Sequence, residues 1–154
     1  VGQELVRLLQ PFQCKINIRD IADRSEFCRA WGAQEMGFEE IITESDILTL
    51  HVPLTHDTEN MIDQTVLAKM KASAFLINTC RGQVVHQGDL HQALGAGEIA
   101  GAGLDVFWPE PPTDIEFLEL PNLMVTPHIG GNAKEAVDSM GRAAIQGMVD
   151  YFSL

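Results

Sequence analysis

The sequence predicts an α/β fold with a doubly wound parallel sheet, and three observations lead to it. Short apolar runs of strand length alternate along the chain with segments of helical periodicity. Hairpin signals are few, which favours parallel strands joined by helices. The 154 residues fit one domain, with no internal repeat and no low-complexity linker.

The first two predicted elements are a helix over 2–12 and a strand over 15–20. Apolar side chains recur at helical spacing in the first segment, and Pro11 marks its end. The strand ends in an acid, Asp20, about twenty residues after Gly2. In dinucleotide-binding folds a glycine opens the first helix, and an acid at this distance binds the ribose hydroxyls. Asp20 is therefore a candidate ribose ligand, and a plain turn residue at a strand end is the alternative.

A carboxylate at Asp20 would repel a 2′-phosphate, which favours NAD over NADP. Arg19 and Arg24 lie nearby in the sequence and leave NADP open. Of the glycine fingerprint GxGxxG that opens such folds, only Val1-Gly2 is present. We therefore expect the other glycines and the first strand to lie upstream of Val1.

The next elements lead to a buried strand at residues 46–53. Helices are expected over 25–31, 38–43 and 63–70, with a short strand over 32–36. The 46–53 run is apolar and closes at Pro53, because proline cannot continue a β-ladder.

A second apolar run, residues 74–77, leads directly to an arginine. The run predicts a strand buried on both faces, and Gly82 permits a tight turn beyond it. Arg81 would then lie in the crevice beyond the carboxyl ends of the strands, where parallel α/β sheets bind ligands. Its planar guanidinium suits a carboxylate or phosphate held by two parallel hydrogen bonds. A surface arginine in an ordinary loop is the alternative.

The remaining elements complete the alternation of helices and strands. They are a helix over 88–94, a strand over 99–107, a proline-rich loop over 109–112, a strand over 123–126 and a helix over 132–152. The last helix is expected to bury Ala136, Val137, Met140, Ala144 and Met148.

Polar side chains follow three of the predicted strands: Arg81, then Asp105 and Glu110, then His128. Because the carboxyl ends of parallel strands meet at one edge of a sheet, we expect these residues to form one site. Histidine exchanges a proton near neutrality, and a carboxylate beside a histidine favours the charged imidazolium. Two glycines after His128 let the backbone approach a ligand closely. A structural histidine is the alternative.

With these motifs in view, the chain resembles the NAD-dependent D-2-hydroxyacid dehydrogenases, a family that includes phosphoglycerate dehydrogenases and glyoxylate/hydroxypyruvate reductases. The motifs are NTCRG at 78–82, GLDVF at 103–107 with Glu110-Pro111, and TPHIGG at 126–131. The resemblance spans nearly all of the chain. It implies a Rossmann-type NAD-binding domain over 1–154 and hydride transfer between NAD(H) and a small D-2-hydroxy acid or 2-oxo acid. It also implies a homodimer.

The resemblance assigns catalytic roles to Arg81, Glu110 and His128. Arg81 would hold the substrate carboxylate, His128 would exchange the proton, and Glu110 would orient the histidine ring. The implied NAD contacts are Val1, Gly2, Asp20, Val52, Pro53, Thr79, Cys80, Asp105, Gly130 and Gly131. Glutamate at position 110 resembles the hydroxyacid members rather than the formate dehydrogenase branch, which has glutamine there.

One departure from the family concerns the second domain. Family members place this domain inside a substrate-binding domain built from both chain ends, and nothing in this sequence corresponds to it. We therefore expect the sequence to be a fragment of a longer two-domain chain and to be inactive alone. Two other functions stay open: an NAD(H)-sensing, corepressor-like binding protein, and phosphite oxidation by the same three catalytic residues.

Composition narrows the partners. The chain carries 10 Lys+Arg against 22 Asp+Glu, a net charge of −12, which disfavours nucleic acid and anionic membrane surfaces. No apolar run approaches the roughly 20 residues of a membrane span. Three cysteines, Cys14, Cys28 and Cys80, form no CxxC pair, which fits reduced thiols in the cytoplasm and gives no reason to expect a metal site.

Overall fold

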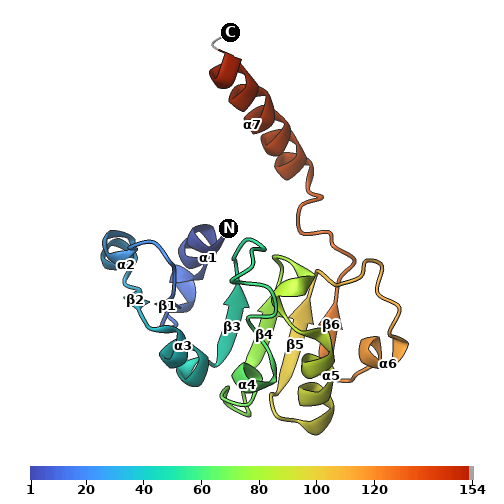
Figure 1. Cartoon of the computed structure of the whole chain (residues 1–154). Helices are drawn as coiled ribbons and strands as arrows, with labels where there is room; N and C mark the ends of the chain where they lie inside the picture. The colour runs from blue at the N-terminus through green and yellow to red at the C-terminus, as the bar shows by residue number, and fades with distance from the viewer. Residues whose placement is uncertain (153–154) are drawn as a thin grey trace.

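The computed structural model describes residues 1–152 and confirms an α/β fold with parallel strands and flanking helices (Figure 1). Its main sheet has four parallel strands in sequence order: β3 (Ile47–Leu50), β4 (Phe75–Asn78), β5 (Gly101–Leu104) and β6 (Leu123–Val125). Asn78 pairs with Leu104 and Leu104 with Val125, so the carboxyl ends of β4, β5 and β6 lie level. The loops that carry the candidate catalytic residues therefore leave the sheet at the same edge.

The first two strands form a separate parallel pair, β1 (Asn17–Ile18) and β2 (Gln34–Glu35). Both strands are shorter than the predicted ranges 15–20 and 32–36. No ladder joins β1 to β3 within residues 1–152, so the single doubly wound sheet of the prediction is here divided in two. Because β1 pairs along one edge only, its hydrogen-bonded length is limited to what β2 offers.

The helices in the first part of the chain follow the predicted pattern closely. They are α1 (Gly2–Leu9), continued by a 3-10 turn over Gln10–Phe12, then α2 (Ser25–Trp31) and α3 (Phe38–Glu44). The bounds of α2 coincide with the prediction. Its end has a local cause, since Gly32 adopts the left-handed conformation that closes a helix.

The later helices are short and capped by side chains. They are α4 (Gln64–Leu67), α5 (Gln87–Ala96) and α6 (Ile115–Leu118), with a 3-10 turn over Gly82–Val84 before α5. Asp63 caps α4 and Asp114 caps α6, each by accepting a hydrogen bond from a backbone N–H of the first turn. Helix α6 was not predicted from the sequence.

The core lies between one face of the four-stranded sheet and the helices α4 and α5 (Figure 1). Leu67, Leu76 and Leu90 are fully buried there. The opposite face is open in the described part of the chain, where Phe75 is 47% and Met124 75% exposed. The prediction that the 74–77 strand is buried on both faces is therefore wrong: its side chains alternate between a covered and an open face.

The last helix, α7 (Lys134–Phe152), projects away from the rest of the molecule (Figure 1). None of its residues is buried, so the predicted burial of Ala136, Val137, Met140, Ala144 and Met148 is wrong. The helical periodicity that motivated the prediction is real. The apolar stripe has no packing partner within residues 1–152, because the segment after β6 leads the helix away from the sheet.

All three cysteines are free thiols, with Cys28 buried, Cys80 half-buried and Cys14 exposed. Over the same 152 residues no helix is both long and apolar enough to cross a membrane.

The burial of Phe117 anchors α6 and yields a test of the fold. Its side chain is fully buried, and the centroid of its ring lies 5.4 Å from the centroid of the His91 ring. Ile115 in the same helix is 59% exposed. Phe117→Ala should lower the free energy of unfolding by about 3–5 kcal/mol because it removes a buried aromatic ring and leaves a cavity. Ile115→Ala, the matched control, should change it by less than about 0.5 kcal/mol. Urea unfolding measures both, and equal losses would contradict this description of α6.

Candidate active site

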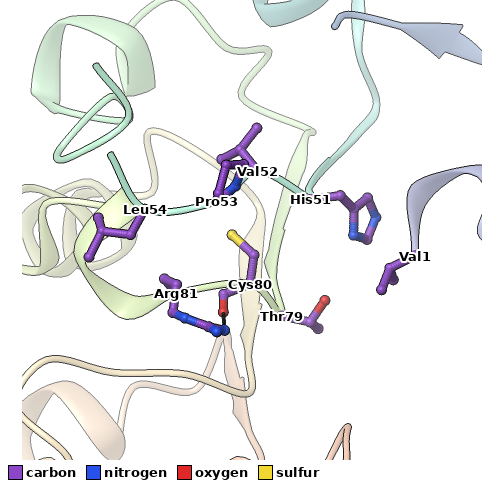
Figure 2. Close-up of a pocket in the computed structure, with 8 residues that line it drawn as sticks. All are labelled: Val1, His51, Val52, Pro53, Leu54, Thr79, Cys80 and Arg81. Carbon is purple, nitrogen blue, oxygen red and sulfur yellow. Dashed lines mark hydrogen bonds between the residues drawn. The ribbon is translucent and has the colours of Figure 1, made fainter. Parts of the chain in front are cut away.

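A cavity of about 470 Å³ opens beyond the carboxyl ends of β3 and β4, where a parallel sheet is expected to bind ligands. Figure 2 shows the side chains that line it, drawn from the loops that follow these two strands and from the start of α1. They are Val1, His51, Val52, Pro53, Leu54, Thr79, Cys80 and Arg81. Five of the ten predicted NAD contacts (Val1, Val52, Pro53, Thr79 and Cys80) lie in this set.

Gly2 and His51 meet at one end of the cavity. A Cβ atom added to Gly2 would lie 3.4 Å from the His51 ring, so the start of α1 packs closely against this histidine. Burial lowers the pKa of His51 below its ordinary value, which favours the neutral imidazole, and Thr49 Oγ1 lies 3.1 Å from its Nε2. His51 and Leu54, which also line the cavity, were not among the residues predicted for the site, although the position of His51 at a strand end was a signal for it.

Asp20 lies at the end of β1, outside the residues that line this cavity. Its Oδ1 accepts a hydrogen bond from Ala22 N at 3.0 Å, and its Oδ2 pairs with Arg24 Nε at 2.7 Å. The Ala22 N–H and then the Arg24 guanidinium hold the pKa of Asp20 below its ordinary value. Asp20 is thus ionised at neutral pH, but Arg24 partly neutralises the charge that would exclude a 2′-phosphate.

Arg81 leaves the end of β4 and lies beside Cys80 in the cavity wall (Figure 2). Its Nη1 donates to the Cys80 carbonyl at 2.6 Å, and it forms no ion pair with any carboxylate of residues 1–152. Gly82, the residue after Arg81, fixes the path of the backbone there. A Cβ atom at Gly82 would stand 2.1 Å from the Phe107 carbonyl oxygen, so only glycine fits there.

Glu110 and His128 form the second part of the site. The carboxylate Oε2 lies 2.9 Å from His128 Nδ1, while Oε1 accepts a hydrogen bond from Phe107 N at 2.8 Å. The bond to His128 and then the bond from Phe107 lower the pKa of Glu110. Because Nδ1 faces a carboxylate, the tautomer with the proton on Nδ1 is favoured, and Nε2 takes no part in this contact.

Asp105 holds the loop that carries His128. It is buried, with 6% of its surface exposed, and its carboxylate accepts hydrogen bonds from Thr126 Oγ1, Ile129 N and Gly130 N. Burial by itself would raise the pKa of Asp105, but these three donors outweigh it and leave the pKa below the ordinary value. Asp105 therefore anchors the loop over 126–130, which carries His128.

The loop conformation explains the first of the two glycines after His128. His128 has a φ of 52°, in the left-handed region that side chains rarely adopt. A Cβ atom at Gly130 would lie 3.0 Å from Asp105 Oδ2, a tight contact, so glycine favours the close approach of the backbone to this carboxylate. At Gly131 a Cβ atom would meet nothing within 4 Å.

The structure therefore brings most of the predicted site residues into two groups and leaves Asp20 outside both. Arg81 and five predicted NAD contacts line the cavity after β3 and β4, whereas Glu110, His128, Asp105 and Gly130 meet beyond β5 and β6. Phe107 connects the two groups, because it abuts Gly82 on one side and donates to Glu110 on the other. No cluster of three or more His, Cys, Asp or Glu side chains suited to a metal ion occurs in the described residues.

The fold and these residues together define a Rossmann-type α/β domain with an arginine and a carboxylate–histidine pair beyond the ends of its strands. The family model of the D-isomer specific 2-hydroxyacid dehydrogenase NAD binding domain matches residues 1–130. The chain belongs to this family.

Known relatives agree with this assignment. The chain is 56% identical over 102 residues to the glycerate dehydrogenase of Methylorubrum extorquens, covering 64% of this chain and 32% of the relative. It is 40% identical over 151 residues to the glyoxylate reductase of Thermococcus litoralis, covering 98% and 46%. The NAD-complexed D-isomer specific 2-hydroxyacid dehydrogenase of Lactobacillus delbrueckii ssp. bulgaricus superposes with a TM-score of 0.84 at 31% identity, covering 99% and 50%. The matched regions thus make up between 32% and 50% of the length of these proteins.

The depressed pKa of Asp105 predicts how stability depends on pH. The folded-state pKa lies below the ordinary value of 3.8, so the stabilisation is complete above that value and is lost as pH falls through the folded-state pKa. Asp105→Asn should lower the free energy of unfolding by about 1–3 kcal/mol at pH 7, because three donors lose a charged acceptor. The difference from wild type should shrink below about pH 4. Urea unfolding at a series of pH values tests this, and a pH-independent difference would contradict it.

Proposed function

We propose that the protein transfers a hydride between NAD(H) and a small D-2-hydroxy acid or 2-oxo acid. The observation that carries the proposal is the Glu110–His128 pair, in which Oε2 and Nδ1 lie 2.9 Å apart. Glu110 follows β5 and His128 follows β6, and β5 pairs with β4, the strand that leads to Arg81. Arg81 forms no ion pair with residues 1–152. A proton donor held by a carboxylate, together with a free guanidinium, suits reduction of a carbonyl next to a carboxylate.

Arg81 would bind the substrate carboxylate and polarise the carbonyl at C2. The guanidinium presents two parallel N–H groups to a carboxylate, and no carboxylate of residues 1–152 competes for them. The hydrogen bond to the Cys80 carbonyl limits the movement of the side chain without neutralising its charge. Held in this way, the guanidinium would orient the substrate so that hydride reaches only one face of the C2 carbonyl.

His128 would donate a proton from Nε2 to the carbonyl oxygen during reduction and accept it during oxidation. Glu110 would keep the imidazole oriented through Nδ1 and stabilise the charged form. NAD(H), when bound, supplies or accepts the hydride. Its site would be formed by the cavity at Val52, Pro53, Thr79 and Cys80, with Val1 and Gly2 at the start of α1.

The remaining NAD contacts would be Asp20 at the ribose, Asp105 near the nicotinamide end, and the turn at Gly130 and Gly131. The ionised carboxylate of Asp20 supports NAD over NADP, because it would repel a 2′-phosphate. The Asp20–Arg24 ion pair at 2.7 Å makes this preference a moderate one.

The finer features of the intact protein are also proposals. The family resemblance supports a homodimer, and the three free cysteines support a cytoplasmic location. The net charge of −12 supports a small-molecule substrate and no nucleic-acid partner. Turnover of NADH with a panel of 2-oxo acids by the intact protein tests the central proposal. NADH binding without turnover would instead support a corepressor-like sensor, and NAD reduction by phosphite alone would support phosphite oxidation.

Substitutions at the catalytic residues should have separable effects. His128→Ala should lower kcat by about 10²–10⁴-fold because it removes the general acid, while NADH affinity stays unchanged. His56→Ala is the matched control, since this histidine is fully exposed. Steady-state kinetics and NADH fluorescence titration provide the two measurements. Wild-type turnover by His128→Ala would eliminate the histidine as the proton donor.

Arg81→Lys should lose much of kcat/KM, because an ammonium group cannot form two parallel hydrogen bonds to the substrate carboxylate. The exposed Arg29 of α2 provides the control substitution Arg29→Lys. Kinetics with glyoxylate would decide. Equal kcat/KM values for Arg81→Lys and wild type would rule out two-point recognition by this side chain.

Asp20 should control the choice of dinucleotide. Asp20→Ala should weaken NADH binding and strengthen NADPH binding, since it removes the negative charge and releases Arg24 to meet a 2′-phosphate. Asp23→Ala is the control, because the Asp23 carboxylate accepts a hydrogen bond from Ser25 N at 2.8 Å, whereas Arg24 pairs with Asp20. Dissociation constants for both dinucleotides test this, and an unchanged ratio would remove Asp20 from the ribose site.

A further inference from the structure

Asn78 is one of two buried polar or charged residues among those the structure describes, and the other is Asp105. Asn78 is the last residue of β4 and is 1% exposed. The two residues adjoin each other, because Asp105 N donates to the Asn78 carbonyl at 3.0 Å. A buried polar side chain is costly unless its hydrogen bonds are made, so its partners indicate what it holds in place.

The partners of the Asn78 amide all belong to the turn that ends in Arg81. Its Nδ2 donates to the Arg81 carbonyl at 2.9 Å. Its Oδ1 accepts from Cys80 N at 3.0 Å and from Cys80 Sγ at 3.1 Å. The side chain thus closes the turn from inside, joining the end of the strand to the residue that faces the cavity.

This arrangement needs an amide of this length. Aspartate has the same shape, but its carboxylate cannot donate to the Arg81 carbonyl, and it would introduce a buried charge. Leucine has a similar shape but no polar atoms, so it would remove the hydrogen bonds that the Asn78 amide makes to the Arg81 carbonyl and the Cys80 N–H. Among side chains of this shape, asparagine alone presents an N–H donor and a separate oxygen acceptor on one planar group, which the two different partners here require.

The chain is also fixed on the far side of Arg81. Gly82 packs so closely against the Phe107 carbonyl that no Cβ atom fits, and Val84 N donates to the Arg81 carbonyl at 3.2 Å. The guanidinium in turn bonds the Cys80 carbonyl at 2.6 Å. The Asn78 amide thus fixes the backbone at Cys80 and Arg81, and the contact with Phe107 fixes it at Gly82. The Arg81 side chain therefore leaves the backbone at a defined position and direction at the edge of the cavity.

We propose that Asn78 is a positioning residue that sets the orientation of Arg81 toward the substrate carboxylate. This inference rests on the proposed function, because it assumes that Arg81 binds the substrate. Asn78 does not touch the substrate; it acts through the Arg81 carbonyl and the Cys80 backbone. Its removal should therefore affect catalysis only when Arg81 is present.

A double-mutant cycle in the intact protein tests this, with NADH and glyoxylate as the probes. Asn78→Leu should lower kcat/KM by about 10- to 100-fold in the wild-type background, mostly through KM. In the Arg81→Ala background it should cause little further loss. The pH profile of kcat/KM should keep its shape, because the Glu110–His128 pair lies on other loops.

The control is Asn122→Leu, which removes a comparable bond, from Asn122 Nδ2 to the Leu94 carbonyl at 3.1 Å, just before β6 at the opposite edge of the sheet. It should leave kcat/KM unchanged. A second variant, Asn78→Asp, keeps the acceptor and loses the donor, and it should lose kcat/KM in the same Arg81-dependent way. Wild-type kcat/KM in Asn78→Asp would overturn the proposal.

The remaining outcomes separate this inference from the proposed function. If Arg81→Ala itself leaves kcat/KM unchanged, the substrate-binding role of Arg81 fails, and the proposed function fails with it. If Arg81→Ala lowers kcat/KM but Asn78→Leu lowers it equally in both backgrounds, only the positioning role is overturned. If both Asn78 variants fail to fold while Asn122→Leu folds, Asn78 serves the fold rather than Arg81, and the proposal is likewise overturned.

Discussion

The buried carboxylate of Asp105 determines the geometry of the candidate site. It accepts hydrogen bonds from Thr126, Ile129 and Gly130, and burial would destabilise its charge without them. His128 lies within the loop that these bonds hold, in a left-handed backbone conformation that costs on the order of 1–3 kcal/mol. The anchoring of the loop on both sides of His128 offsets that cost. The imidazole therefore faces Glu110 without either of these two side chains having to hold the loop itself.

Local signals in the sequence predicted the parts of the fold that depend on local interactions. The bounds of α2 were correct because they depend on residues inside and next to the helix, such as Gly32. The strands were predicted too long, because the length of a ladder depends on the partner strand. β1 has two paired residues only because β2 offers two. Burial was wrong where a covering element was assumed, at Phe75 on the open face of the sheet and along α7.

The same distinction applies to the site. The sequence singled out Arg81, Glu110 and His128 as candidates because each follows a strand, and strand ends are visible in a hydrophobic pattern. It did not predict the hydrogen bonds of the buried Asn78 amide to Cys80 and Arg81. An asparagine after an apolar run has the same local signal whether it forms a surface turn or holds a buried one. Nor did it predict that the carboxylate of Asp105 is engaged by the His128 loop, because those contacts join residues 21 to 25 positions apart.

The negative net charge of the chain affects how the candidate site could bind an anion. With a net charge of −12, the chain as a whole repels an anionic substrate, so affinity must come from a local cation. Between residues 32 and 133 the cations are Lys69, Lys71 and Arg81. Both lysines are paired, with Glu39 and Asp46. Arg81 alone among them forms no ion pair with residues 1–152, and a hydrogen bond to a neutral carbonyl restrains it without consuming its charge. An arginine held in this way binds an anion without first losing a carboxylate partner.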